Sequence, residues 1–151
     1  MPLSRRTFVH ASLVGTALTA VVAQRANAAL PPAVLSATSP AGAIRAALGS
    51  DTMVSDERVR VIVPDRAENG DVVPVSVDAD LPNIKRIALV AEKNPSPVIA
   101  TFALAPEVGG FIATRIKLAE TGNVMAIVES DGKLHMGSKS VQVLIGGCGG
   151  E

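Results

Sequence analysis

The sequence predicts an all-β protein, and the fold class that fits it best is an immunoglobulin-like antiparallel β-sandwich. From residue 57 onward, apolar and polar residues alternate with a period of two, as they do in half-buried strands. About eight such segments follow one another at roughly ten-residue spacing, with turn residues between them. One short N-terminal helix and a flexible C-terminal Gly-Gly-Cys-Gly-Gly arm complete this prediction.

The first 28 residues have the composition of an export signal. Ser4-Arg5-Arg6-Thr7-Phe8 holds the paired arginines, Arg5 and Arg6, of a twin-arginine motif. The weakly apolar run that follows is well short of the ~20 residues that a membrane-spanning helix needs, and nothing in it repeats at helical period. Ala26-Asn27-Ala28 has the small-residue pattern of a signal peptidase site, so cleavage is expected after Ala28. These features predict a periplasmic protein exported by the twin-arginine pathway, with no membrane span after cleavage.

Charge and length limit the function classes open to the mature chain. The whole chain has 14 basic and 14 acidic residues, and residues 1–28 contain three of the basic ones and no acid. The remaining 123 residues therefore carry a net charge of −3, which gives no basic excess for nucleic acid or an anionic membrane. That length suits one domain that folds without disulfides or metal. The expected organisation is a signal peptide (1–28), a lead segment with the helix (29–56), the β-sandwich (57–145) and the arm (146–151).

Local signals place the helix and the strands. Ser39-Pro40 is a helix start, Ala41, Ile44 and Leu48 share one helical stripe, and Gly49 is a stop, so a short helix should pack on the domain's edge or on a partner. Asn69-Gly70 predicts a hairpin turn, and Pro74 predicts an edge or bulged strand. The expected strands lie at 59–63, 73–79, 84–90, 98–105, 111–118, 124–129, 133–137 and 141–145.

Cys148, the only cysteine, is the residue that most clearly predicts chemistry. A cysteine kept for packing should lie in a periodic apolar segment, whereas this one lies between two glycine pairs, Gly146-Gly147 and Gly149-Gly150. Glycine leaves the backbone free and sterically open, so the thiol should be presented on a flexible stem. A single cysteine in an oxidising compartment cannot form an internal disulfide. It must pair between chains, carry an adduct or stay a free thiol. Because no residue near it in the sequence would activate the thiol, Cys148 is interpreted as a carrier that another protein activates.

Other chemistries for this cysteine fit the sequence less well. A cysteine protease would need His135, the only histidine after residue 28, as its base. A copper site built from His135, Met136 and Cys148 would lack the second histidine that blue-copper sites have. A prenylation signal would need aliphatic residues where Gly149 and Gly150 stand. No metal and no cofactor are predicted. A cysteine that only cross-links a non-catalytic β-sandwich interaction module to its partner stays the alternative.

Several motifs, in order along the chain, resemble the SoxY family of sulfur carriers in the periplasmic thiosulfate-oxidising Sox complex. They are Ala67-Glu68-Asn69-Gly70 with Val73-Pro74-Val75, then Glu92-Lys93-Asn94-Pro95, then Thr114-Arg115-Ile116-Lys117, and finally Gly146-Gly147-Cys148-Gly149-Gly150. The resemblance covers essentially the whole chain after residue 28. One departure is Glu151, because the family pattern usually ends at the second glycine pair.

The resemblance implies a covalent substrate carrier that is not itself an enzyme. Cys148 would be the attachment point for thiosulfate-derived sulfur adducts, and Gly146, Gly147, Gly149 and Gly150 would form a slender stem that enters narrow active sites. The implied partners are a SoxZ-type subunit in a heterodimer or higher oligomer, a SoxAX-type cytochrome, a SoxB-type hydrolase and a SoxCD-type sulfane dehydrogenase.

Overall fold

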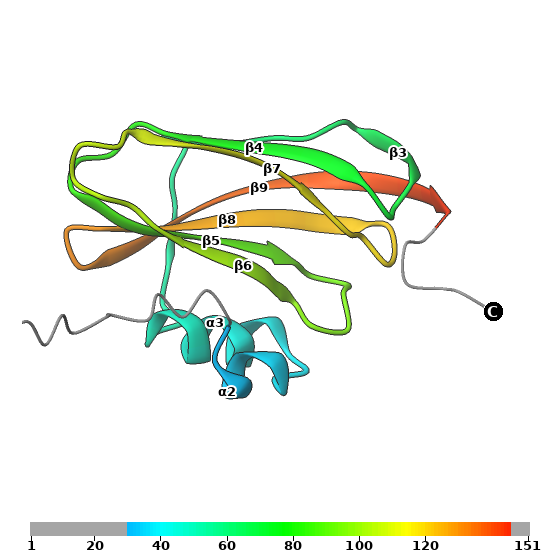
Figure 1. Ribbon diagram of the computed structural model, residues 1–151, viewed down its shortest axis with the longest axis horizontal. Coiled ribbons are helices and arrows are strands. Elements are labelled where there is room, and N and C mark those ends of the chain that lie inside the picture. Colours follow the sequence, from blue (N-terminus) through cyan, green and yellow to red (C-terminus); the bar gives the residue numbers. More distant parts are fainter. Residues whose placement is uncertain (1–29, 146–151) are drawn as a thin grey trace, which may run out of the picture.

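The computed structural model describes residues 30–145, and Figure 1 shows two β-sheets with two helices against one of them. The predicted export motif, the cleavage position and the glycine-cysteine arm lie outside the described residues. The elements, in chain order, are α2 (Pro32–Leu35), α3 (Pro40–Leu48), β1 (Val54–Ser55), β2 (Val59–Ile62), β3 (Arg66–Asn69), β4 (Val73–Ala79), β5 (Ile84–Ala91), β6 (Val98–Ala103), β7 (Gly110–Ile116), β8 (Gly122–Ser130) and β9 (Lys133–Ile145).

The sheets form the predicted sandwich. The larger sheet has the strand order β1-β9-β8-β5-β6, and β3 pairs with β9 as well. The smaller sheet has the order β2-β4-β7. The pairings are antiparallel, as predicted, except that β1 and β3 both run parallel to β9. The two segments predicted at 133–137 and 141–145 are one continuous strand, β9.

Period-two alternation produces the core between the sheets. In β4, Val73, Val75 and Val77 are buried, while Pro74 between them is exposed. The core is aliphatic, as expected for a chain with three phenylalanines and no other aromatic residue. Its fully buried members are Val77, Ile87, Leu89, Val124, Ala126, Val128 and Val141. Removing this much apolar surface from water is the main source of stability for a sandwich of this size.

The helices cover the outer face of the larger sheet. Val34 of α2 and Ile44 and Leu48 of α3 pack with a second buried cluster that includes Val90 and Ile127. The prediction of a helix at the domain's edge or on a partner was therefore wrong. The caps are as predicted, because Ser39 Oγ accepts the Gly42 N–H at 3.2 Å and Gly49 ends α3 with φ +83°. The predicted stripe needs one correction, since Ala43 is buried in place of Ala41.

Two turn predictions also need correction. Asn69-Gly70 does form a turn, in which Asn69 Oδ1 accepts the Asp71 N–H at 2.8 Å. The turn makes no hairpin, because β3 and β4 belong to different sheets. Pro74 was predicted to mark an edge or a bulge, yet β4 is the central strand of the smaller sheet. Since the β2 pairing ends where Ile62 faces Ser76, the missing N–H of Pro74 removes no bond to β2.

Candidate functional site at the root of the arm

The last strand projects beyond its antiparallel neighbour. Pairing between β8 and β9 ends where Gly122 faces Val141, and β9 continues for four more residues to Ile145. Figure 1 shows this end of β9 beside β3. Residues 142–145 are called the arm root here, because the predicted arm begins with the next residue, Gly146.

Both edges of the arm root are hydrogen-bonded. On one side β3 runs parallel to it, with Ala67 opposite Val143 and Asn69 opposite Ile145. The Gly70 N–H extends this pairing by donating to the Ile145 carbonyl at 2.7 Å. On the other side the Thr121 hydroxyl accepts the Val143 N–H at 2.8 Å and donates to the Val143 carbonyl at 3.3 Å. The point where the arm leaves the domain is therefore fixed on two sides.

The internal motifs that carry the family resemblance meet at this end of the sandwich. The Gly70 carbonyl accepts the Leu118 N–H at 2.8 Å. Asn94 donates to the Lys117 carbonyl and accepts the Ala119 N–H, both at 2.8 Å. Lys117 also lies 3.4 Å from an Asp71 carboxylate oxygen. Three motifs far apart in the sequence thus form one hydrogen-bonded support for the arm root.

Sequence reasoning missed this support. It treated Asn69-Gly70 only as a turn and gave Thr121 no role. Asn94 offered the clearest signal, because an asparagine beside a proline turn can both donate to and accept from neighbouring backbone. Nothing in the local sequence could show which backbone groups it would bind.

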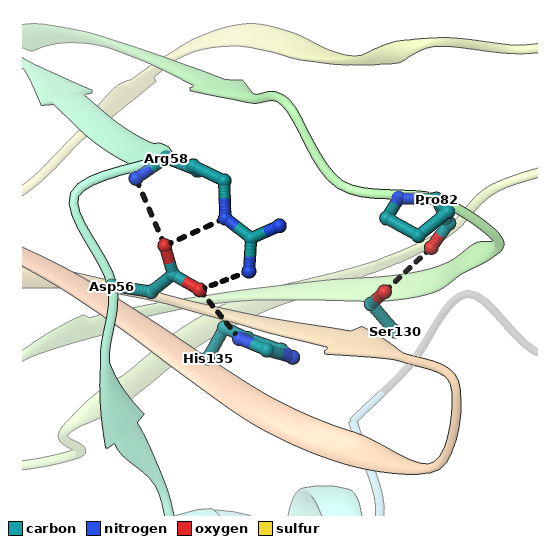
Figure 2. Close-up of polar contacts among 5 residues, drawn as sticks. All are labelled: Asp56, Arg58, Pro82, Ser130 and His135. Carbon is teal, nitrogen blue, oxygen red and sulfur yellow. Dashed lines mark hydrogen bonds and ion pairs between the residues drawn. The ribbon is translucent and has the colours of Figure 1, made fainter.

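A second polar cluster lies near the opposite end of β9, and Figure 2 shows its geometry. Asp56 Oδ1 accepts from the Arg58 backbone N–H and from Arg58 Nε, both at 3.0 Å. Its Oδ2 lies 2.7 Å from Arg58 Nη2 and 2.8 Å from His135 Nδ1. Nearby, Ser130 donates its hydroxyl to the Pro82 carbonyl. The bond between Asp56 and His135 fastens the segment between β1 and β2 to the start of β9.

The geometry separates His135 from Cys148. Ile145 follows His135 by ten residues along β9, a distance of about 33 Å. Cys148 follows Ile145 by three residues, so its Cα can lie at most about 11 Å from that of Ile145. Within one chain, the two side chains therefore cannot form a protease pair or share a copper ion. Met136 also packs toward the helices, in the second buried cluster.

The Asp56 cluster should make stability depend on pH. Hydrogen bonds from Arg58, with a smaller contribution from His135, hold the pKa of the Asp56 carboxyl well below its usual range. A carboxyl whose pKa is lower in the folded state contributes stability above its unfolded pKa of about 3.9, and loses it as the pH falls further. We expect Asp56→Asn to unfold at a lower temperature than the parent at pH 7, and the difference to narrow below about pH 3.9.

Thermal unfolding followed by circular dichroism from pH 2.5 to pH 7 checks this prediction. Glu57→Gln is the matched control, because Glu57 is the exposed neighbouring carboxylate. A difference in unfolding temperature between Asp56→Asn and the parent that stayed constant over the whole pH range would contradict the assigned role of Asp56.

Within residues 30–145, no group of three or more histidine, cysteine, aspartate or glutamate side chains is placed to hold a metal ion. In the same range, no helix is both long enough and apolar enough to cross a membrane. The one thiol of the chain, Cys148, lies just beyond the described residues.

Several solved structures are similar to this chain. A superoxide reductase (neelaredoxin) from Ignicoccus hospitalis is 19% identical, with a TM-score of 0.51, over 58% of this chain and 80% of that one. At this identity the likeness shows the fold alone. The structure of the sulfur carrier protein SoxY from Chlorobium limicola f thiosulfatophilum is 31% identical, with a TM-score of 0.63. That match covers 68% of this chain and 90% of the Chlorobium chain.

A search of curated proteins gave no match. The family model described as sulfur oxidation protein SoxY matches residues 44–148, which is more than half of the chain and takes in both the sandwich and Cys148. The predicted family is thereby confirmed: the chain belongs to the SoxY family of sulfur oxidation proteins.

Proposed function

We propose that this protein is a covalent sulfur carrier in thiosulfate oxidation, with the Cys148 thiol as the attachment point. Membership of the SoxY family supports a carrier role in sulfur oxidation. The proposal that Cys148 is the attachment point rests on the position of the only thiol. Cys148 is the last residue matched by the family model. It follows a strand end that is hydrogen-bonded on both edges.

In the proposed chemistry, the thiol is the covalent attachment point for the substrate. Loading joins the Cys148 sulfur to the terminal sulfur of thiosulfate, releasing the thiol proton and two electrons, which a SoxAX-type c-type cytochrome accepts. A SoxB-type hydrolase then adds water, releases sulfate and leaves a persulfide on Cys148. A SoxCD-type sulfane dehydrogenase oxidises the outer persulfide sulfur to a sulfonate, taking the oxygen from water and passing the electrons to a c-type cytochrome. The carrier lowers no barrier itself; it holds the cargo at high effective concentration beside each enzyme.

The glycines and the leader have supporting roles in this proposal. Gly146, Gly147, Gly149 and Gly150 form the narrow stem, because residues without a Cβ fit a channel that bulkier side chains would block. Arg5 and Arg6 direct twin-arginine export to the periplasm, with cleavage after Ala28. A SoxZ-type subunit is the proposed stable partner.

Intact-mass spectrometry tests the proposal. The mature protein is purified without reductant from cells grown on thiosulfate. We expect mass increments of sulfur or thiosulfate-derived groups that a reductant removes and that are absent from Cys148→Ala. A spectrum that held only the free thiol, or a disulfide-linked dimer, would contradict the carrier role and favour an interaction module that uses its cysteine for cross-linking.

A further inference from the structure

Chain length limits how an enzyme can reach the cargo. Cys148 follows Ile145 by three residues, so the two Cα atoms are at most about 11 Å apart. An enzyme that acts on a group attached to Cys148 must therefore bring the surface around its active-site entrance against the end of the sandwich. This step rests on the proposed carrier function.

That end of the sandwich exposes apolar side chains. Ile145 is 67% exposed, Leu144 is 53% exposed and Val72 is 61% exposed. These three side chains are called the apolar collar here. Among the described residues, eight large apolar side chains are at least half exposed, and three of the eight belong to the collar. Scattered exposed apolar residues are ordinary, but a group at the point of closest approach to a partner marks an interaction site.

The collar does not serve the core. Val141 is fully buried and Val143 packs against the edge of the core, so Ile145 continues the same row of β9 side chains past the end of the core. Leu144 lies on the opposite face of the strand. Val72 follows Gly70 by two residues, and the Gly70 N–H bonds to the Ile145 carbonyl, which places Val72 at the same end. The hydrophobic cores of the described residues include none of the three.

The surroundings of the collar are polar. Lys117 pairs with Asp71, with side chains 65% and 47% exposed, and Arg66 donates to Gln142 at 3.3 Å. An apolar centre within a polar rim is the usual composition of a protein interface, and a patch this small suits a transient one. A carrier that visits several enzymes in turn needs contacts that release quickly.

We propose that the apolar collar is the docking face for the enzymes that process the cargo on Cys148, and that it contacts an apolar rim around the entrance of their active sites. The collar sets how tightly carrier and enzyme associate, whereas the arm delivers the reacting sulfur. A charge placed on the collar should therefore weaken association without altering the thiol.

Leu144→Glu tests this proposal. In thiosulfate-dependent cytochrome c reduction with purified Sox components, we expect the apparent KM for the carrier to rise about tenfold, because the new carboxylate would be desolvated at the interface. Val72→Glu repeats the test from the turn between β3 and β4 and should raise KM in the same direction. Leu35→Glu is the matched control, since Leu35 is 57% exposed on α2, away from the collar.

Two further readouts separate docking from other effects. The rate of Cys148 alkylation by iodoacetamide and the midpoint of thermal unfolding should match those of the parent. An unchanged KM for both Leu144→Glu and Val72→Glu would overturn the docking proposal while leaving the carrier function intact. Parent protein whose turnover did not depend on Cys148 would overturn the carrier function, and the docking proposal with it.

Discussion

Replacing Cys148 with serine is expected to abolish thiosulfate-dependent turnover in a reconstituted Sox system. The proposed adduct needs a sulfur–sulfur bond, which the serine hydroxyl cannot form, so the loss should be complete rather than partial. The family model reaches this residue, and the chain has no second cysteine to replace it. Oxygen uptake after addition of thiosulfate measures the effect.

Two controls show whether the loss is chemical. Circular dichroism spectra and copurification with the SoxZ-type subunit should be unchanged, since Cys148 lies three residues beyond the last strand residue, Ile145. Glu151→Gln alters the same tail and keeps the thiol, so it should retain turnover. Normal oxygen uptake by Cys148→Ser would disprove the proposed attachment point.

A buried methyl group at Gly137 is expected to destabilise the fold by about 3 kcal/mol, the upper end for overpacking a core. Gly137 lies in β9 opposite Ala126, where β2 crosses close to the larger sheet. A Cβ built at Gly137 would overlap the Val59 carbonyl oxygen, which is backbone and cannot rotate away. To admit alanine, β2 would have to move away from β9 and open the core around Val59.

Denaturation in urea measures this change as a lower free energy of unfolding for Gly137→Ala. Gly109→Ala is the matched control, because a Cβ there meets no atom within 4 Å and the φ angle of Gly109 is not in the left-handed region. That control should match the parent or exceed it slightly, since alanine lowers the entropy of the unfolded chain. Equal unfolding free energies for the two variants would contradict the close approach of β2 to β9.

Local patterns predicted the elements that depend on local physics. Ser39 and Gly49 cap α3 as expected, because a cap is made by neighbouring backbone and side-chain groups. Alternation at Val73, Val75 and Val77 identified β4 in the same way. The pairing of β3 with β9 was not predictable, because β3 has no alternating apolar pattern and its partners lie 76 residues away, as for Arg66 and Gln142.

A feature of the sequence does indicate where α3 packs, but it is not part of the alternating apolar pattern. In β5 the residues Ala88, Leu89, Val90 and Ala91 are all buried, which requires cover on both faces of the sheet. A continuous apolar run in an otherwise alternating sandwich therefore indicates where a helix can pack. The stripe predicted for α3 included Ala41, but Ala43 is buried instead. These two residues point to nearly opposite sides of the helix, and only the docked helix shows which of them faces the sheet.

Of the candidate site, the sequence predicted the thiol but not the hydrogen-bonded support of the strand that leads to it. Cys148 stood out because its identity and its glycine neighbours are local facts of the sequence. The support beneath it did not, because Gly70, Asn94 and Thr121 act through backbone groups of distant segments. The separate motifs have a common structural role only because the fold brings them together near Ile145.

The length of β9 has a consequence for how the protein bears mechanical load. Under the proposed carrier function, an enzyme that draws the predicted arm into its channel would pull on Ile145 roughly along the strand. The nine residue pairs between β8 and β9, and the pairing of β9 with β1 and β3, then share the force in shear. Hydrogen bonds perpendicular to the pull resist together instead of opening one by one. We expect single-molecule pulling through the C-terminus to require a higher unfolding force than pulling that peels β6 from its edge.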